Sequence, residues 1–126
     1  MKKVTVLSFL LTFLVASVVF AGAVAAAFKW GETQHNFGKI QQGKPVTAEF
    51  TFTNAGQQPL IVSGARGSCG CTGVEYPKEP IMPGAAGVIK ATFNAASAGS
   101  FNKTVTVESN AEAGAVYLEI RGEVVE

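Results

Sequence analysis

Two cysteines, Cys69 and Cys71, are the residues of this chain best suited to chemistry. They lie one glycine apart in the stretch Ser68-Cys69-Gly70-Cys71-Thr72, and the sequence holds no other cysteine. Thiols this close can form a disulfide, bind a soft metal ion, or pack as small apolar side chains. The remaining residues offer them little help, since the sequence contains one histidine and no aspartate.

A disulfide between Cys69 and Cys71 is favoured if the protein is exported, because nearby thiols pair in an oxidising compartment. A ring that spans one glycine is tight, and a strained bridge is reduced more easily than a relaxed structural one. We expect Gly70 to take the unusual backbone angles of such a ring. The pair is therefore a candidate redox or disulfide site.

Two other interpretations of the cysteine pair remain open. Two thiolates can hold Cu(I) or Zn, but structural zinc takes four ligands, and the sequence adds only His35 and Met82. Alternatively, the cysteines pack as small hydrophobic residues in a purely structural role. We predict no metal and no cofactor.

The sequence predicts no catalytic residue and no enzyme, apart from residual thiol redox activity. A Ser-His-Asp arrangement would need Glu in place of Asp, and His35 is the only imidazole. A Cys-His pair of His35 with Cys69 would require the fold to bring them together. A histidine at the start of an edge strand is the simpler interpretation. Arg66 could activate Cys69 or be a solvated charge.

The first 25 residues have the pattern of a secretory signal peptide. Met1-Lys2-Lys3 is positive, residues 4–20 are almost wholly apolar, and small residues follow. We predict a signal helix cleaved after Ala25, at Ala23-Val24-Ala25, with Ala25-Ala26-Ala27 as second choice. An uncleaved leader would be a membrane anchor, because the apolar run approaches the length that spans a bilayer. We expect a bacterial protein that is periplasmic, in the cell envelope or secreted.

Charge gives no sign of a nucleic-acid partner. Without Lys2 and Lys3, the ten Lys and Arg residues fall to eight, against nine Glu, so the exported part has a net charge of −1. Near-neutral, evenly spread charge provides neither a nucleic-acid footprint nor a polybasic membrane patch. We therefore expect an unknown protein partner, and membrane contact only through an uncleaved leader.

Residues 26–126 are predicted to form one small all-β domain, because short alternating segments are separated by turn residues. Val46 to Asn54 alternates most clearly, with two phenylalanines on its apolar face. Lys103 interrupts the apolar face of a later strand, and we place it near a sheet edge. The other predicted strands cover residues 35–40, 60–63, 87–94, 101–109 and 116–124.

Glycine and proline mark the breaks between these segments. Gly64 and Gly67 predict a bulge or a close backbone approach at the end of the 60–63 strand. Residues 73–86 carry three prolines and cannot form a central strand. Within them, Met82-Pro83-Gly84-Ala85 fits a type II turn with glycine at its third position.

The predicted fold is an Ig-like antiparallel β-sandwich of about seven strands, preceded by the N-terminal signal helix. Regularly spaced strands with turns between them, and no helix after the leader, are typical of this class. Cys69 and Cys71 are too close in sequence to form the inter-sheet disulfide of antibody domains.

Several segments have the order and spacing of a known family, and on these the chain resembles the bacterial Ig-like family called domain of unknown function 1573. The resemblance covers nearly all of residues 26–126 and implies an exported or envelope-located Ig-like module, similar to those of hydin-type proteins. It implies no activity. The matching segments are His35-Asn36-Phe37-Gly38-Lys39-Ile40 with Gly43, Phe50-Thr51-Phe52-Thr53-Asn54-Ala55-Gly56, Pro59-Leu60-Ile61, Ser68-Cys69-Gly70-Cys71-Thr72, Pro80-Ile81-Met82-Pro83-Gly84, Phe101-Asn102-Lys103, Ser109-Asn110 and Gly122-Glu123-Val124.

We therefore predict an exported, non-catalytic Ig-like module that mediates protein-protein or cell-envelope interactions. Exposed sheet edges suit partner strands, so strand addition is the expected mode of binding. The alternative is a thiol redox or soft-metal-handling protein that uses Cys69 and Cys71.

Overall fold

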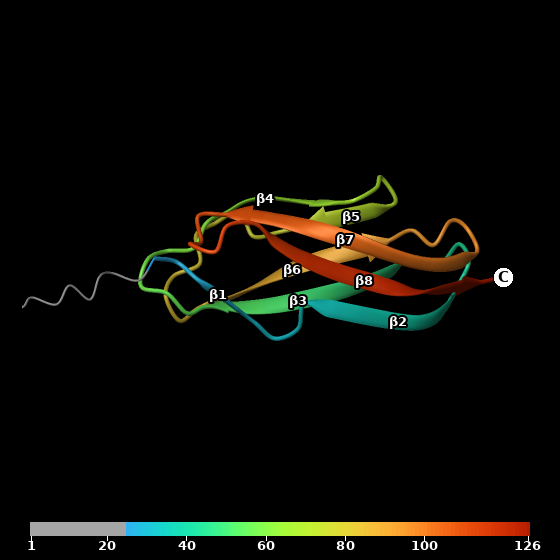
Figure 1. Ribbon diagram of the computed structural model, residues 1–126, viewed down its shortest axis with the longest axis horizontal. Coiled ribbons are helices and arrows are strands. Elements are labelled where there is room, and N and C mark those ends of the chain that lie inside the picture. Colours follow the sequence, from blue (N-terminus) through green and yellow to red (C-terminus); the bar gives the residue numbers. More distant parts are fainter. Residues whose placement is uncertain (1–24) are drawn as a thin grey trace, which may run out of the picture.

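The computed structural model describes residues 25–126, which form a two-layered β-sandwich (Figure 1). These residues contain eight strands and no helix. The strands are β1 (Phe28–Trp30), β2 (Gln34–Gln41), β3 (Val46–Asn54), β4 (Val62–Gly67), β5 (Thr72–Glu75), β6 (Ala86–Phe93), β7 (Gly99–Ser109) and β8 (Val116–Val125).

The strands form two four-stranded sheets, which confirms the predicted all-β, Ig-like sandwich. One sheet has the order β1-β3-β6-β5, and the other has the order β2-β8-β7-β4. Neighbouring strands are antiparallel except β2 and β8, which run parallel. The parallel pair was not predicted. It arises because the chain leaves the first sheet after β1 and joins the edge of the second sheet as β2.

Two short edge strands were also not predicted. β1 lies before the first predicted strand, and β5 lies at the start of the proline-containing stretch. With three and four residues they are too short to show alternation. They form because β3 and β6 present backbone groups along their edges, and short edge strands of this kind are common in natural sheets.

The core lies between the two sheets, with β3 near its centre. Ala48, Phe50 and Phe52 are at most 1% exposed, whereas Thr47 and Glu49 on the opposite face are exposed. The predicted alternation of β3 is therefore confirmed. Each large apolar side chain buried in this way contributes about 1.5–3 kcal/mol. The other fully buried residues of the inner faces are Ile89, Ala91, Val105, Val107, Leu118 and Ile120.

The buried amide of Asn54 ties the beginning of the described chain to the turn that follows β3. Its Oδ1 accepts from the N–H of Ala27 at 3.3 Å and of Gly56 at 2.9 Å. Its Nδ2 donates to the carbonyl oxygens of Gln58 at 2.8 Å and Ile81 at 2.9 Å. Asn54 is 1% exposed, and both the oxygen and the nitrogen of its side-chain amide have hydrogen-bond partners, as buried polar groups require.

The predicted leader, including its signal helix, lies outside the described residues except for Ala25. Ala26, the next residue, is 1% exposed and belongs to the core. A Cβ on Gly56 would come within 2.8 Å of the Cα of Ala26, so the chain is closely packed just after the predicted cleavage position. Within residues 25–126 there is no helix of the length and hydrophobicity needed to cross a membrane.

Candidate functional site

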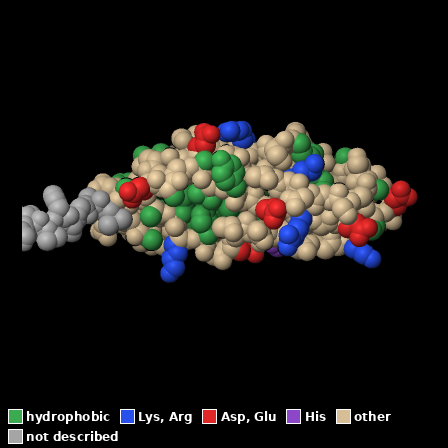
Figure 2. All heavy atoms as spheres, in the orientation of Figure 1, with side chains coloured by type: hydrophobic (Ala, Val, Ile, Leu, Met, Phe, Trp, Pro, Cys, Tyr) green, Lys and Arg blue, Asp and Glu red, His purple; other side chains and the backbone are tan. Residues whose placement is uncertain are grey.

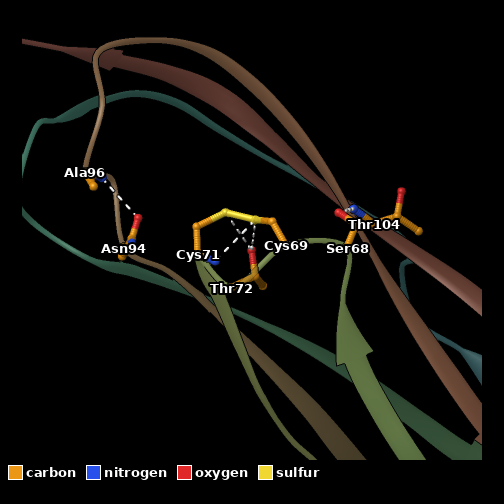
Figure 3. The surroundings of a disulfide bond; sticks show 7 residues. All are labelled: Ser68, Cys69, Cys71, Thr72, Asn94, Ala96 and Thr104. Carbon is orange, nitrogen blue, oxygen red and sulfur yellow. Dashed lines mark hydrogen bonds between the residues drawn. A yellow bond between two sulfur atoms is a disulfide. The ribbon is translucent and has the colours of Figure 1, made fainter.

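The cysteine pair lies in a turn that passes from one sheet to the other. β4 ends at Gly67 in the second sheet, and β5 begins at Thr72 in the first. Between them Cys69 and Cys71 are joined by a disulfide (Figure 3). The position at a strand end agrees with the sequence analysis, although β4 covers 62–67 rather than 60–63.

A close approach of Gly67 to Thr72 sets the width of this turn. A Cβ on Gly67 would stand 2.8 Å from the Cβ of Thr72 and 3.0 Å from its carbonyl oxygen. The predicted bulge is also present, as a register shift between Val62 and Gly64. Both glycine predictions for this strand are confirmed.

Hydrogen bonds hold the turn on both sides, independently of the sulfur–sulfur bond. The N–H of Ser68 donates to the carbonyl of Thr104 at 2.8 Å, and the N–H of Thr104 donates to the Ser68 hydroxyl at 3.2 Å. On the side of the first sheet, the N–H of Asn94 donates to the carbonyl of Cys71 at 3.0 Å. Thr72 N–H closes the turn onto the carbonyl of Cys69 at 3.3 Å.

Gly70 differs from the expectation. It is not among the glycines with positive φ in the described chain, so the ring does not use it for a left-handed conformation. A Cβ at Gly70 would meet no atom within 4 Å, so neither backbone conformation nor space requires a glycine at this position. The tip of the turn is exposed to solvent.

Two hydrogen-bond donors lie beside the sulfur atoms. The N–H of Cys71 points to Cys69 Sγ at 3.3 Å, and Thr72 Oγ1 lies 3.9 Å from each of the two sulfur atoms (Figure 3). Thr72 is buried, while both cysteines are half-buried. Thr72 was not predicted as a site residue. Only its position directly after Cys71 could have indicated that it lies beside the sulfur atoms.

A cavity of about 220 Å³ adjoins Cys71; we call it the disulfide cavity. Phe93 and Phe101 line it, and their rings are stacked with centroids 4.0 Å apart. Lys103 also lines it. The lining therefore combines two aromatic residues, one lysine and one residue of the disulfide.

Lys103 lies near a local edge of the second sheet, as predicted, although its strand, β7, lies between β8 and β4. The pairing of β4 with β7 ends at Gly67 and Val105, before Lys103 is reached. The lysine is accommodated because it lies beyond the end of β4, where the disulfide cavity is open.

The other residues considered with the cysteines lie elsewhere. His35 Nδ1 is 3.3 Å from Glu32 Oε2, and its ring contacts Phe37 edge-on. Arg66 pairs with Glu108 at 3.1 Å on the exposed face of the second sheet. Met82 is 55% exposed, beyond the bridge between Leu60 and Ile81. In residues 25–126, no three His, Cys, Asp or Glu side chains gather as metal ligands would.

A larger hollow of about 540 Å³ lies over β2, β7 and β8. Its charged lining residues are Lys39, Arg121 and Glu123, so both signs are present. Figure 2 likewise shows positive and negative side chains interspersed over the visible face. The hollow contains no thiol, and the disulfide cavity is where reactive groups and an apolar wall meet.

Comparison with protein families decides the affiliation of the chain. The family described as "Protein of unknown function (DUF1573)" matches residues 28–124. The chain belongs to this DUF1573 family. The resemblance noted from the sequence segments is thereby confirmed. No curated protein sequence matches the chain.

Solved structures place this DUF1573 domain among Ig-like and PapD-like sandwiches. A protein of unknown function from Porphyromonas gingivalis W83 has a TM-score of 0.69 at 15% identity, covering 80% of this chain and 48% of that one. The ASH/PapD-like domain of human CEP192 has a TM-score of 0.63 at 11% identity, over 90% and 96%. The YadV chaperone has a TM-score of 0.59 at 14% identity, over 79% and 52%.

These likenesses establish the fold alone. The DUF1573 chain spans about half the length of the Porphyromonas protein and of YadV. At this coarse level it is a β-domain of unknown function with Ig-like and PapD-like neighbours, which is consistent with a non-catalytic module.

Proposed function

We propose that the protein is an exported, non-catalytic module of the bacterial envelope or its surroundings that binds an extended segment of another protein by strand addition. The signal-peptide pattern supports export. The scarcity of catalytic side chains, and the pairing of His35 with Glu32, support a binding role. Interspersed charges of both signs favour a protein partner over a nucleic acid (Figure 2).

The observation that carries this proposal is the open edge of β3. β1 pairs with β3 only at Phe52, Thr53 and Asn54, and the last bond on that side runs from Gly31 N–H to the Thr51 carbonyl at 3.0 Å. The bond from Ala55 N–H to the Ala27 carbonyl shows that odd-numbered residues face this edge. Thr47 and Glu49 therefore direct backbone groups outward, and no backbone group among the described residues pairs with them there.

Unpaired backbone groups along a strand are a template for an additional strand. The side chains of Phe37 and Ile40 on β2, and of Val46 on β3, are only half-buried although they pack against the core. An extended segment that continues the line of β1 past Gly31 would pair with Thr47 and Glu49. It would also cover apolar surface on these half-buried side chains, which adds to the hydrogen bonds of strand addition.

The YadV neighbour is itself a chaperone, and chaperone-pilin complexes are an example of strand addition. Strand addition is therefore a natural first mode of binding to test for this protein.

A proline in place of Glu49 tests the proposal. Glu49→Pro removes an outward-facing N–H and blocks the edge, whereas the pairing of β3 with β6 uses the even-numbered residues on the other side. The matched control is Glu49→Thr, which changes the side chain and keeps the N–H. We expect the native protein and Glu49→Thr to crosslink the same partner in envelope extract, and Glu49→Pro to lose it. Equal capture by Glu49→Pro, or no partner for the native protein, would contradict strand addition at this edge.

A further inference from the structure

The disulfide of Cys69 and Cys71 is placed where a second molecule can reach it. Both cysteines are half-buried, and the tip of the turn at Gly70 is exposed with free space around it. Exposed disulfides are the more labile ones. Here one of the two bridged residues, Cys71, lines a cavity.

We propose that this disulfide exchanges with the two thiols of an extended, cysteine-containing segment of another exported protein, and that an apolar side chain of the segment binds in the disulfide cavity. The site lies at the β4–β5 turn, and it uses none of the β3 edge residues to which strand addition is assigned. The two proposals can therefore fail separately.

The shape of the disulfide cavity suits a side chain rather than a larger molecule. Its volume of about 220 Å³ is below the range of about 300–1,000 Å³ usual for small-molecule sites. Phe93 and Phe101, 5% and 9% exposed, supply a stacked aromatic wall. Lys103 makes no ion pair within the described part of the chain, so its ammonium group is available to attract the thiolate of an incoming cysteine.

The order of the exchange follows from the positions of the two sulfur atoms. A thiolate of the bound segment attacks Cys71 Sγ, forms a mixed disulfide, and the electron pair of the broken bond leaves on Cys69 Sγ. The N–H of Cys71, 3.3 Å from Cys69 Sγ, stabilises this thiolate in preference to one on Cys71, and a stabilised thiolate leaves faster. The hydroxyl of Thr72 lies 3.9 Å from both sulfur atoms and can support a thiolate on either.

The second thiolate of the segment completes the reaction. It attacks the sulfur of the segment that is bound to Cys71, which forms the disulfide of the segment and releases Cys71 as a thiolate. Protons from the two segment thiols end on Cys69 and Cys71. The segment is oxidised by two electrons and the protein is reduced by two, so the exchange itself needs no further oxidant.

The turn keeps its shape when the disulfide is reduced, because hydrogen bonds on both sides also hold it. Ser68 and Thr104 are joined by two hydrogen bonds on one side, and Asn94 N–H binds the Cys71 carbonyl on the other. Figure 3 shows the pair of bonds between Ser68 and Thr104 next to the disulfide. The reduced cysteines therefore stay close to one another.

The first test uses the purified oxidised protein and a short synthetic peptide with two cysteines beside a phenylalanine. Acid quenching, alkylation and mass spectrometry follow both partners. We expect one peptide disulfide to form for each protein disulfide lost, at a rate on the order of tenfold above that with the same peptide carrying serine in place of phenylalanine. A protein disulfide that survives the peptide, or equal rates with both peptides, would overturn the proposal.

Variants test the assigned roles. Lys103→Met and Thr72→Val are expected to slow peptide oxidation severalfold while the folded spectrum is unchanged. Lys90→Met is the matched control, since Lys90 lies on β6 opposite Glu75 and does not line the disulfide cavity. If Lys90→Met slowed peptide oxidation as much as Lys103→Met does, the effect would come from the loss of any positive charge, and the assigned site would be refuted.

Single-cysteine variants test the order of attack. Cys69→Ser keeps the cysteine that lines the cavity, and Cys71→Ser keeps the other. With the phenylalanine peptide supplied as an activated mixed disulfide, we expect Cys69→Ser to form the protein–peptide adduct several times faster than Cys71→Ser. Equal rates, or the reverse order, would contradict attack at Cys71.

Discussion

Gly67 and Thr72 come so close that a Cβ on Gly67 would stand 2.8 Å from Thr72 Cβ. This contact brings the end of β4 in one sheet against the start of β5 in the other, and the disulfide turn lies between them. It is the geometric condition for the candidate site, because it fixes Thr72 beside both sulfur atoms.

Gly67→Ala should therefore destabilise the domain. The added methyl group meets backbone as well as side-chain atoms of Thr72, and overpacking of this kind costs about 1–3 kcal/mol. Urea unfolding followed by circular dichroism measures the change. Gly70→Ala is the matched control, with an expected change within about 0.5 kcal/mol, because its Cβ meets no atom within 4 Å. Equal effects of the two substitutions would show that the close contact is unimportant.

Removing the disulfide should cost little stability. In the chain-entropy model a loop closed over a sequence separation of two residues contributes only about 1.5 kcal/mol. The Cys69→Ser/Cys71→Ser double variant is therefore expected to stay folded, with its free energy of unfolding lowered by about that amount. The same loss should appear when the native protein is unfolded in the presence of reductant. Global unfolding of the double variant would show that the bridge is a structural staple.

Asn54→Ala should be among the most damaging substitutions of a polar residue. It leaves the N–H of Ala27 and Gly56 and the carbonyl of Gln58 without a partner, and it removes one of the two hydrogen bonds that the Ile81 carbonyl accepts. We expect the free energy of unfolding to fall by about 3 kcal/mol, measured by urea titration.

Asn110→Ala is the control for that measurement. Its exposed side chain also bonds two backbone groups, the N–H of Ile61 and the carbonyl of Pro59, but water can replace it there. A loss of less than about 1 kcal/mol is expected. If Asn110→Ala proved as harmful as Asn54→Ala, burial would not be the reason for the effect.

Trp30→Phe should be nearly neutral. Trp30 Nε1 is buried and has no hydrogen-bond partner in the described structure, so its removal abolishes an unsatisfied donor. A phenylalanine keeps aromatic packing against Phe28 and Phe52, whose ring centroids lie 4.8 and 5.1 Å from the tryptophan ring.

We expect Trp30→Phe to change the free energy of unfolding by less than about 1 kcal/mol, and Trp30→Ala to lower it by about 3 kcal/mol. Circular dichroism must follow the unfolding, because Trp30 is the only tryptophan. A large loss for Trp30→Phe would show that the indole N–H has a partner in solution.

The long strands could be predicted because their patterns are local. In β3, residues of alternating polarity fall on opposite faces, and the structure buries one face and exposes the other. The type II turn at residues 82–85 could be predicted for the same reason. In the structure Gly84 has a φ of 85°, and Ala85 N–H donates to the Met82 carbonyl at 2.9 Å. Such features depend on a few neighbouring residues.

The candidate site could be predicted only in part from the sequence, because its remaining residues come from strands that are distant in the chain. Cys69 and Cys71 could be identified in the sequence by residue type and spacing. Lys103 and Phe93 reach the same cavity only through the pairing of β7 and β6 with their neighbours. Likewise, the open edge of β3 exists because β1 stops at Trp30, and nothing in the sequence of β3 itself signals that its partner ends there.

Strand addition at β3 is tested most directly by photo-crosslinking in living cells. A photoreactive amino acid in place of Glu49, on the open edge, is compared with one in place of Glu112, which lies in the exposed turn before β8. We expect the Glu49 probe alone to capture one recurring extended peptide segment. Adding Thr47→Pro, which removes the other outward-facing N–H of this edge, should abolish the capture. Capture of the same segment by both probes, or of none by the Glu49 probe, would contradict strand addition.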